Sequence, residues 1–344
     1  MFNEQKVIKK IQEALEDSVE DASIHVAVSG GADSMVLMHI ASKIKNTNVF
    51  IHHVKHNISN NTDAWASFVK KSATEMGYDI ASQYIEHNLN FDSMSNFESE
   101  ARKKRYDAIF SCMNVGDILL LGHHADDQVE NVLINIFKGR GINGITSLQE
   151  KNTHSNGVVL LRPLIDSHKK DIITHLNNQG VSFVHDESND SSDYDRNFIR
   201  NKVIPLLLSR FKPLKESILS VHKALTNSKI VMEELINDKI NIISDDEGNI
   251  DVALYNNLSK ETRIEILIHI LRRSGCYTYN QKVIKEFISQ AENIQKNGGV
   301  CLSDNTYRTK IVMKSDNDVF NIVFKKVIIG NKKSKVFFIQ KHNL

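Results

Sequence analysis

Hydrophobic positions in the amino-terminal part of the chain repeat first with the period of a helix and then with the period of a strand. Val7, Ile11 and Leu15 mark one face of an opening amphipathic helix. The pattern then predicts, in order, strand Ile24–Val28, helix Ser34–Lys45, strand Val49–Val54, helix Asp63–Met76, strand Tyr78–Ile85, helix Phe97–Met113, strand Asp117–Leu121 and helix Asp126–Lys138. This alternation indicates an α/β domain with a doubly wound, mainly parallel sheet, which binds ligands at the carboxyl ends of its strands.

The alternation stops near residue 210, and we place a domain boundary between residues 212 and 213. Beyond it, Ile264, Leu267 and Leu271 have the spacing of a buried helical stripe. Residues 300–344 read as short strands separated by glycine and asparagine turns. The sequence therefore predicts a first domain over residues 1–212. A helical second domain and a small α+β carboxyl-terminal part follow over residues 213–344.

A turn rich in small residues, Ser29-Gly30-Gly31-Ala32-Asp33-Ser34, connects the first predicted strand to the next helix. Its two glycines allow a tight turn and a close approach of the backbone to a ligand. The helix start offers unpaired N–H groups and a positive dipole end, so phosphate is the natural ligand. The Lys-Ser/Thr of a Walker A loop and the third glycine of a dinucleotide fingerprint are missing. The simplest alternative is an ordinary turn in which Asp33 caps the helix.

Polar side chains also follow the predicted strand Asp117–Leu121. In a helix that begins near residue 125, Asp127 and Glu130 share one face, and His123 and His124 lie at its mouth. Such a group could bind a divalent ion, move a proton or hold an amine; the alternative is a plain helix start with acids near its dipole. Zinc is a poor fit because no cysteine or third histidine has ligand spacing. Magnesium with ATP fits better, since it needs only one or two carboxylates.

Composition narrows the class of protein. The 344-residue chain is 41% hydrophobic and 25% charged, as expected of a globular protein in water, and its net charge of +1 indicates no particular partner. No apolar stretch approaches the roughly 20 residues that span a bilayer, and the first residues lack the apolar core of a signal peptide. Cys112, Cys276 and Cys301 are far apart and read as free thiols in a reducing compartment. We therefore expect a cytoplasmic protein with no membrane partner.

Charge is nevertheless segregated along the chain. Residues 186–195 are acidic, whereas the segment from residue 320 to residue 344 contains lysines and no acid. Such a cluster is either a solvated tail or a surface that contacts the phosphates of a nucleic acid. Its members are Lys325, Lys326, Lys332, Lys333, Lys335 and Lys341.

Longer motifs connect these features to a known family. The turn at residues 29–34 resembles the loop of the N-type ATP pyrophosphatases, the PP-loop superfamily. From residue 24 to residue 206 the chain resembles one branch of it, tRNA(Ile)-lysidine synthetase. The segments that carry this resemblance are Asn96–Tyr106, Gly122–Asn131, Arg162–Leu164, Asp186–Asn189, Tyr194–Arg200 and Val203–Leu206. At Asn57 and Ser59 the chain departs from the family, which has glycine and arginine there, and the effect of this replacement stays open.

The resemblance implies an adenine nucleotide alpha hydrolase-like fold and an ATP-dependent ligase. In the implied reaction, ATP adenylates the wobble cytidine of the isoleucine tRNA with a CAU anticodon and pyrophosphate leaves. Free L-lysine then displaces AMP to give lysidine. Residues 1–212 would be the adenylating domain and residues 213–344 a tRNA-binding region. ATP and Mg²⁺ are the implied cofactors, and neither is expected to be tightly bound.

Each candidate residue has a task in this reaction. Catalysis is assigned to Asp33, His123 and Asp127. His123 and Asp127 are assigned jointly to adenylation and to activation of the amine. Asp33 would also hold Mg²⁺. The phosphates of ATP would lie on Ser29, Gly30, Gly31, Ala32, Asp33 and Ser34. Five arginines, whose planar donors suit oxyanions, are candidates for contact with tRNA or other phosphates: Arg102, Arg105, Arg140, Arg196 and Arg200.

Two other functions stay open from the sequence. Another PP-loop tRNA-modifying enzyme, such as a thiolase, would use the same adenylation step. It would usually bring paired or catalytic cysteines, and Cys112 lies inside a predicted helix. A non-catalytic RNA-binding relative would not need Asp33, His123 and Asp127, which are all present. The oligomeric state is also open, with a homodimer as one alternative.

Overall fold

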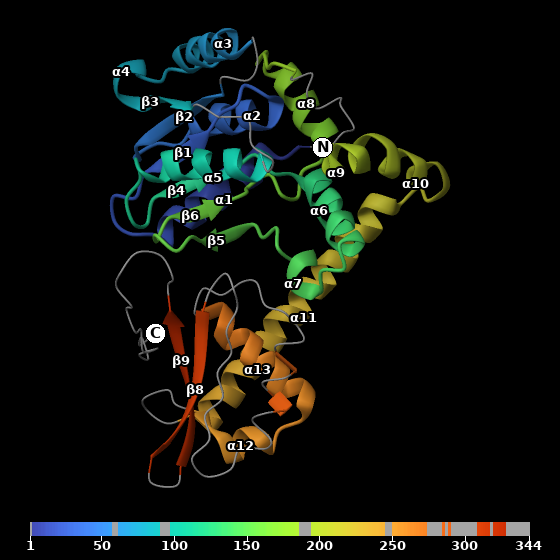
Figure 1. The fold of residues 1–344 in the computed structure, drawn as a ribbon. Coiled ribbons are helices and arrows are strands. Elements are labelled where there is room, and N and C mark those ends of the chain that lie inside the picture. The colour runs from blue at the N-terminus through green and yellow to red at the C-terminus, as the bar shows by residue number, and fades with distance from the viewer. Residues whose placement is uncertain are drawn as a thin grey trace. The chain divides into compact units, whose positions relative to one another are not determined.

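The structure, a computed structural model, describes residues 2–56, 61–89, 97–185, 194–244 and 250–273, residues 284, 285, 288 and 289, and the strands at 308–316 and 319–327. The chain divides into two compact units, Met1–Leu225 and Thr226–Leu344, each with its own sheet and core (Figure 1). The division falls within helix α11 (Leu214–Ile243), later in the chain than residue 212, where we place the boundary from the sequence.

Some residues singled out in the sequence lie outside the described part of the chain: Asn57, Ser59, Asn96, the segment 186–189, Cys276, Cys301, Lys332, Lys333, Lys335 and Lys341. Lys325 and Lys326 belong to strand β9 (Val319–Val327), for which the description is limited to the course of the backbone. The lysine cluster of the carboxyl end therefore stays a prediction from the sequence.

The first unit is built on a six-stranded sheet with the order β3-β2-β1-β4-β6-β5 (Figure 1). All neighbouring strands are parallel except β5, which runs antiparallel to β6 at one edge. Ile24 on β1 pairs with Val49 on one side and Ile118 on the other. The predicted doubly wound, mainly parallel sheet is confirmed. The strands are β1 (Ile24–Ala27), β2 (Val49–His56), β3 (Tyr84–Leu89), β4 (Ile118–Leu120), β5 (Lys151–Thr153) and β6 (Val159–Leu161).

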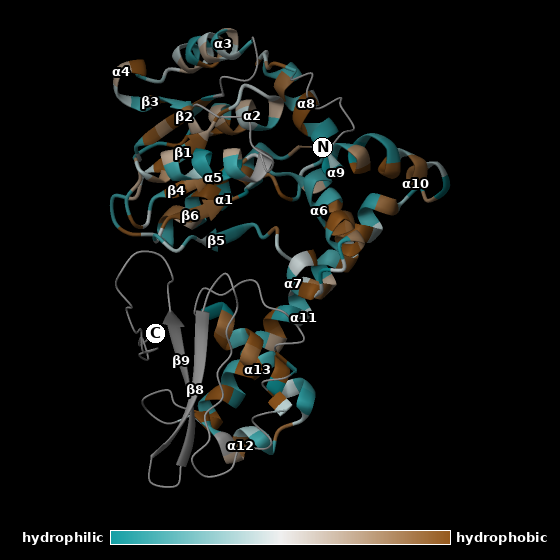
Figure 2. Cartoon of the chain, in the orientation of Figure 1, coloured by the Kyte–Doolittle hydropathy of each residue, from teal (hydrophilic) through white to brown (hydrophobic). Residues whose placement is uncertain are grey.

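The two faces of this sheet enter different cores because side chains alternate along each strand. On β1, Ile24 and Val26 enter the core shared with α1, α2, α3 and α8, whereas Ala27 packs toward the core that contains Ile109 of α5. Hydrophobic residues accordingly gather on the central strands β1, β4 and β6 (Figure 2). The helices are α1 (Glu4–Glu16), α2 (Ala32–Ala41), α3 (Thr62–Glu75), α5 (Phe97–Phe110) and α8 (Lys169–Asn178).

A row of histidines crosses three neighbouring strands of this sheet. His25 Nδ1 lies 2.7 Å from His52 Nε2, and His52 Nδ1 lies 2.9 Å from His87 Nε2. At the other end, His25 Nε2 lies 3.3 Å from Oδ2 of Asp117. Because a carboxylate only accepts, this geometry favours each ring donating toward Asp117. Burial lowers the pKa of all three histidines, that of His52 to about 3, so the rings are neutral at neutral pH.

The predicted strand Tyr78–Ile85 is wrong. The segment contains a short helix, α4 (Ile80–Gln83), and strand β3 begins only at Tyr84. Asp79 caps α4 by accepting a hydrogen bond from the N–H of Ala81 at 3.0 Å, and such local bonds compete with a sheet ladder. Strands β5 and β6, of three residues each, are absent from the sequence-based prediction.

A bent helical segment packs along α6, which begins directly after β4. Val129 of α6 shares a core with Ile199 and Ile204 of this segment. The segment contains one π-helical turn, a feature that is frequent at functional sites. The elements are α6 (Ala125–Phe137), α7 (Ile142–Ile145), α9 (Asp195–Phe198), the π-helical turn η2 (Ile199–Val203) and α10 (Ile204–Arg210).

The second unit has an antiparallel sheet with the order β7-β9-β8. Leu267 and Leu271 of α13 are buried in its core, which confirms the predicted helical stripe. In the part of the chain that the structure describes, no helix is long and apolar enough to cross a membrane. The elements are β7 (Ile250–Asp251), α12 (Val252–Asn256), α13 (Lys260–Arg273), β8 (Arg308–Asp316) and β9.

Candidate active site

The turns after β1 and β4 leave neighbouring strands at the point where the strand order of the sheet reverses (Figure 1). Doubly wound sheets bind their ligands at this point. Gly122, in the second turn, allows the turns to approach. A Cβ atom at Gly122 would lie 3.1 Å from Cβ of Asp33 and 3.2 Å from the carbonyl carbon of Asp33. The two groups of polar residues that the sequence predicts as a site are therefore adjacent.

The first turn is held in shape by its own serines. The hydroxyl of Ser34 donates to the carbonyl of Gly31 at 2.9 Å and accepts from the N–H of Ser29 at 3.2 Å. Helix α2 begins at Ala32, with Gly31 as its N-cap, so Asp33 does not cap the helix as the simpler alternative supposes. The first N–H groups of α2, at Ala32 and Asp33, have no acceptor within the helix and remain as donors for an anion.

Gly30 gives this turn its backbone conformation. Its φ of 97° lies in the left-handed region that favours glycine. A Cβ atom at Gly30 would also lie 2.9 Å from Cγ2 of Val184. The N–H of Val184 donates to the carbonyl of Gly30 at 2.9 Å, so residues after α8 cover one side of the turn.

Asp33 points from the first turn of α2 toward Lys169, the first residue of α8, and accepts a hydrogen bond from its ammonium group. The backbone N–H of Lys169 donates to Oδ2 of Asp126 at 2.8 Å, and Oδ1 of Asp126 accepts from the ammonium of Lys215 on α11. Burial alone would raise the pKa of Asp126, but its bonds to Lys169 and Lys215 hold it below its usual value. We call Asp33, Asp126, Lys169 and Lys215 the lysine half of the site.

Asp127 and Glu130, also on α6, face two arginines. Oδ1 of Asp127 accepts from Nη2 of Arg196 at 2.9 Å and from Nη2 of Arg200 at 3.2 Å. Glu130 accepts from Nε of Arg196 at 2.8 Å and from Nε of Arg200 at 2.6 Å. Burial alone would raise the pKa of Asp127, but His124 and Arg196 hold it below its usual value. We call Asp127, Glu130, Arg196 and Arg200 the arginine half.

The two histidines at the start of α6 differ in their surroundings. His124 caps the helix: its Nδ1 accepts from the N–H of Asp127 at 3.3 Å, and Asp127 accepts from the N–H of His124 at 3.0 Å. Nε2 of His124 lies 3.6 Å from Oδ1 of Asp33. Burial lowers the pKa of His123 to about 3, so its ring is neutral. Among the described residues Nδ1 of His123 has no hydrogen-bond partner, which leaves it for a ligand.

The five predicted arginines lie in three places. Arg196 and Arg200 belong to the arginine half, in direct contact with Asp127. Arg102 and Arg105 occupy exposed positions on α5, and Arg140 is exposed just beyond the end of α6. Two of the five thus contact a predicted catalytic residue directly, and the charge of a third, Arg102, adds to burial in lowering the pKa of His123.

The surroundings of Asp33 fit a magnesium ion that takes part of its ligands from a nucleotide. Oδ1 of Asp33 is buried and meets no hydrogen-bond partner in the described part of the chain. Over the same residues, no three histidine, cysteine, aspartate or glutamate side chains are grouped as a metal site. One free carboxylate oxygen suits Mg²⁺ that is otherwise bound by phosphate and water, and does not suit a metal held by protein alone.

No motif in the sequence marks Lys169 or Lys215 as a site residue. Lys169 is 136 residues from Asp33 in the chain, and Lys215 is 89 residues from Asp126. Neither lies in a motif with a recognisable spacing. The available signal is indirect, because Lys169 follows the segment Arg162–Leu164 that resembles the family.

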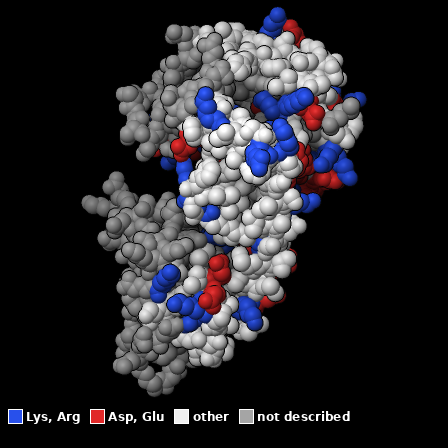
Figure 3. All heavy atoms as spheres, turned by 90° about the vertical axis from the view of Figure 1, so that its right-hand side faces the viewer, with Lys and Arg blue, Asp and Glu red and all other residues white. Residues whose placement is uncertain are grey.

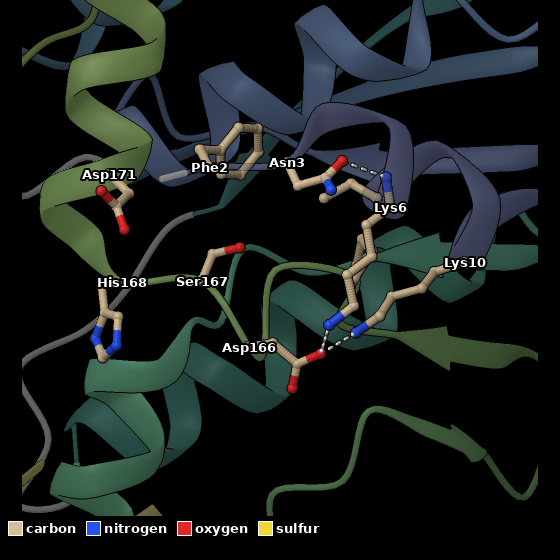
Figure 4. A pocket seen from close by; sticks show the side chains of 10 residues that line it. Phe2, Asn3, Lys6, Lys10, Asp166, Ser167, His168 and Asp171 are labelled. Atoms are coloured by element: carbon tan, nitrogen blue, oxygen red, sulfur yellow. Dashed lines mark hydrogen bonds and ion pairs between the residues drawn. The ribbon is translucent and has the colours of Figure 1, made fainter. Parts of the chain in front are cut away.

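A separate cavity of about 220 Å³ lies between α1 and the loop that leads into α8 (Figure 4). Lys6 and Lys10 point toward Asp166, whose Oδ2 accepts from them at 2.7 and 2.8 Å. Lys10 also donates to Glu150 at 2.5 Å. Because these ammonium groups already pair with carboxylates, the cavity offers little free positive charge, and none of the predicted site residues lines it.

Lysine and arginine side chains gather on the face of the first unit that carries α10 (Figure 3). Lys202, Arg210 and Lys212 are exposed there. These cations follow Arg196 and Arg200 in the chain, and unlike those two arginines they are exposed at the surface.

The sequence matches the family model described as PP-loop domain over residues 3–207, which includes every residue of the site except Lys215. Curated relatives named tRNA(Ile)-lysidine synthase include one from Haemophilus ducreyi (30% identical, covering 70% of this chain and 55% of that protein) and one from Vibrio parahaemolyticus (33% identical, 61% and 48%). The relative from Wigglesworthia glossinidia brevipalpis is 29% identical over 90% of this chain and 81% of its own length.

The chain spans about half the length of the first two of these relatives. The family model, in contrast, covers more than half of this chain and the whole of its six-stranded sheet. The predicted fold class agrees with that model, and the chain belongs to the PP-loop domain family.

Proposed function

We propose that the protein is a tRNA(Ile)-lysidine synthase, a ligase that joins free L-lysine to the wobble cytidine of the isoleucine tRNA with a CAU anticodon at the expense of ATP. The carrying observation is the contact between the PP-loop turn and the start of α6, where Nε2 of His124 lies 3.6 Å from Oδ1 of Asp33. A group activated on the first turn would lie beside His123 and Asp127. The names of the curated relatives support the same reaction.

In the first step, the carbonyl oxygen at carbon 2 of the cytosine attacks the α-phosphorus of ATP, and the bond to pyrophosphate breaks. The phosphates would lie against the start of α2, where Ser29, Ser34 and the first N–H groups of the helix converge. Gly30 and Gly31 allow the backbone to approach them. An anticodon loop suits this step because its bases are splayed and single-stranded.

Asp33 would hold Mg²⁺ through Oδ1, the oxygen without a hydrogen-bond partner among the described residues. When bound, the ion would neutralise charge on the departing pyrophosphate. In the absence of a ligand, Asp33 is held by the first turn of α2 and by Lys169. Its carboxylate therefore lies beside the turn on which the phosphates would bind.

In the second step, the amine of lysine attacks carbon 2, gives up a proton, and AMP leaves with the transferred oxygen. His123 and Asp127 are the residues that we assign to this step and to holding the base. The neutral ring of His123 can accept a hydrogen bond from the base or from the amine. Asp127 is ionised and can attract the ammonium form of lysine.

The tRNA would contact the arginines and the exposed cations near α10. Arg196 and Arg200 lie next to Asp127, and Lys202, Arg210 and Lys212 are exposed cations that follow them in the chain. Arg102, Arg105 and Arg140 stay further candidates for phosphate contact, as does the region of residues 213–344. A cytoplasmic location follows from the same assignment.

The test is to incubate the full chain with ATP, Mg²⁺, labelled lysine and total bacterial tRNA, and to analyse the nucleosides of the digested tRNA. The proposal expects labelled lysine in one modified cytidine, with release of AMP and pyrophosphate. Omission of ATP and the variant Asp33→Asn serve as negative controls.

Sulfur incorporation in place of lysine would contradict the proposal and favour a thiolase. Tight tRNA binding without any nucleotide turnover would contradict it in favour of a non-catalytic RNA-binding protein.

A further inference from the structure

Lys169 is placed where a phosphate ligand would be needed, although no motif marks it. It is the first residue of α8, and among the described residues Asp33 is the one acceptor that its ammonium group meets. An ammonium group carries three donors, so two of them remain for a ligand. The side chain of Lys169 is 38% exposed, which leaves it room to move.

Three helices begin around this ammonium group. Asp33 lies in the first turn of α2, Lys169 opens α8, and Asp126, which accepts from the N–H of Lys169, lies in the first turn of α6. The amino-terminal ends of three helices, each with a positive dipole end, are therefore linked through Lys169. The dipoles favour binding of an anion there, and the carboxylates of Asp33 and Asp126 oppose it. Binding of an anion therefore depends on the lysines that neutralise these carboxylates, Lys169 and Lys215.

The backbone of Lys169 is held in place, whereas its ammonium group can change its hydrogen-bond partner. Its backbone N–H is held by Asp126, and Asp126 is held in turn by Lys215. Within the described part of the chain, the ammonium group makes a single bond, to Oδ2 of Asp33, whose side chain is 25% exposed. A point charge on a flexible stem can leave one oxygen for another without moving the backbone.

We infer that Lys169 is a ligand of the ATP phosphates. Before ATP binds, its ammonium group is paired with Asp33. On binding of ATP with Mg²⁺, the ammonium group moves from Asp33 to phosphate oxygens, and the carboxylate of Asp33 turns to the metal. No covalent bond changes in this step. The inference rests on the proposed use of ATP, but it concerns nucleotide binding alone and requires neither tRNA nor lysine.

The exchange of partners predicts opposite effects for the two residues when magnesium is absent. Without the metal, Asp33 only repels phosphate and retains Lys169. Removing its charge in Asp33→Asn should therefore tighten the binding of a metal-free nucleotide. Removing the ammonium group in Lys169→Met should weaken it, and in the double variant the part of the gain that comes from releasing Lys169 should be lost.

The experiment is a calorimetric titration of the full chain with an ATP analogue that carries a methylene group between the α- and β-phosphates, in EDTA and again in Mg²⁺. For Lys169→Met we expect the Kd to rise at least about tenfold in both buffers, since a charge-assisted bond to phosphate is lost. Lys169→Arg should recover part of this loss. Lys170→Met is the matched control, because Lys170 is the exposed neighbour on the same helix, and its Kd should stay within about twofold of the parent chain.

A Kd for Lys169→Met equal to that of the parent chain would overturn the inference. So would an equal gain in EDTA for Asp33→Asn and for the double variant, because Lys169 would then have no part in the gain. Thermal melting of each variant identifies loss of fold, and Lys169→Arg keeps the charge if Lys169→Met unfolds. A chain that passes these tests but makes no lysidine would refute the proposed function and leave the role of Lys169 intact.

Discussion

The lysine half and the arginine half of the site contain two carboxylates and two cations each, yet they are built differently. In the arginine half, Glu130 is 3% exposed at its side chain and accepts from both Arg196 and Arg200. In the lysine half, Asp33 is 25% exposed and accepts a single bond from Lys169. Planar guanidinium groups on buried carboxylates form a fixed frame, whereas an ammonium group on a flexible stem can be exchanged for a ligand.

From this difference we propose separate tasks for the two halves. The lysine half adjoins the PP-loop turn and is suited to a nucleotide that binds and leaves. The arginine half holds Asp127 in one orientation beside His123, where the base and lysine would react. Loss of the lysine half should therefore impair nucleotide chemistry in a folded protein, and loss of the arginine half should impair the fold itself.

The largest effect is expected for Asp33→Asn. A neutral amide cannot balance the charge of Mg²⁺, so the rate of pyrophosphate release should fall by about a thousandfold or more while the melting temperature stays close to that of the parent chain. Asp63→Asn is the control, because Asp63 is 89% exposed and pairs with Lys55 outside the site. A rate near that of the parent chain would remove Asp33 from the chemistry.

Glu130→Gln tests the opposite half. It leaves Arg196 and Arg200 with one carboxylate fewer at a buried position, and we expect the free energy of unfolding to fall by about 2 to 3 kcal/mol. Urea denaturation measures this change. Asp195→Asn breaks the exposed pair with Lys138 and should cost less than about 1 kcal/mol. Equal losses in the two variants would mean that the arginine half is no more than a surface ion pair.

The pH dependence of the free energy of unfolding distinguishes the contribution of the histidine row, formed by His25, His52 and His87, from that of the two halves of the site. Burial lowers the pKa of His52 to about 3 in the folded chain. Below pH 6.5, His52 is therefore protonated in the unfolded chain but stays neutral in the folded chain. Stability should therefore fall as the pH is lowered, by about 1 to 2 kcal/mol between pH 6.5 and 5 from His52 alone.

Over the same range the carboxylates of Asp126 and Asp127 stay ionised, because their pKa values lie below the usual ones. A flat curve for the parent chain over this range would contradict the neutral histidine row.

The smallest effect is expected outside both halves. If the carboxyl-terminal lysines contact tRNA phosphates, changing Lys332, Lys333, Lys335 and Lys341 together to glutamine should weaken tRNA binding several-fold. It should also reduce its salt dependence by roughly one unit of slope for each lost contact. ATP binding to the first unit should not change. An unaltered salt slope would transfer tRNA recognition to the arginines between residues 102 and 200.

The sequence predicts those parts of the molecule that are specified locally. The doubly wound sheet follows from hydrophobic periodicity, and the PP-loop turn and the start of α6 follow from short motifs placed directly after strands. Tyr78–Ile85 is misleading because Tyr78 is buried at the turn after α3, where its hydroxyl donates to the carbonyl of Met38 at 2.7 Å, while residues 80–83 form the partly exposed helix α4. Periodicity cannot distinguish burial in a turn from burial in a strand.

The remainder of the site depends on contacts between distant segments. Lys169, Lys215 and Val184 reach the two turns from the second part of the first unit, and Gly122 matters because of what a Cβ atom there would meet. The sequence places Arg196 and Arg200 among phosphate ligands but gives no indication of their bonds to Asp127 and Glu130. Those bonds exist only once the segment of α9 and α10 packs along α6.

The most direct test of the division between the halves is to measure pyrophosphate release with each substrate omitted in turn. If ATP is activated on the PP-loop turn and lysine enters only at the second step, tRNA and ATP alone should release pyrophosphate, and lysine should be required only for release of AMP and formation of lysidine. Pyrophosphate release that requires lysine and proceeds without tRNA would contradict the account, because the amino acid and not the base would then be the group that is adenylated.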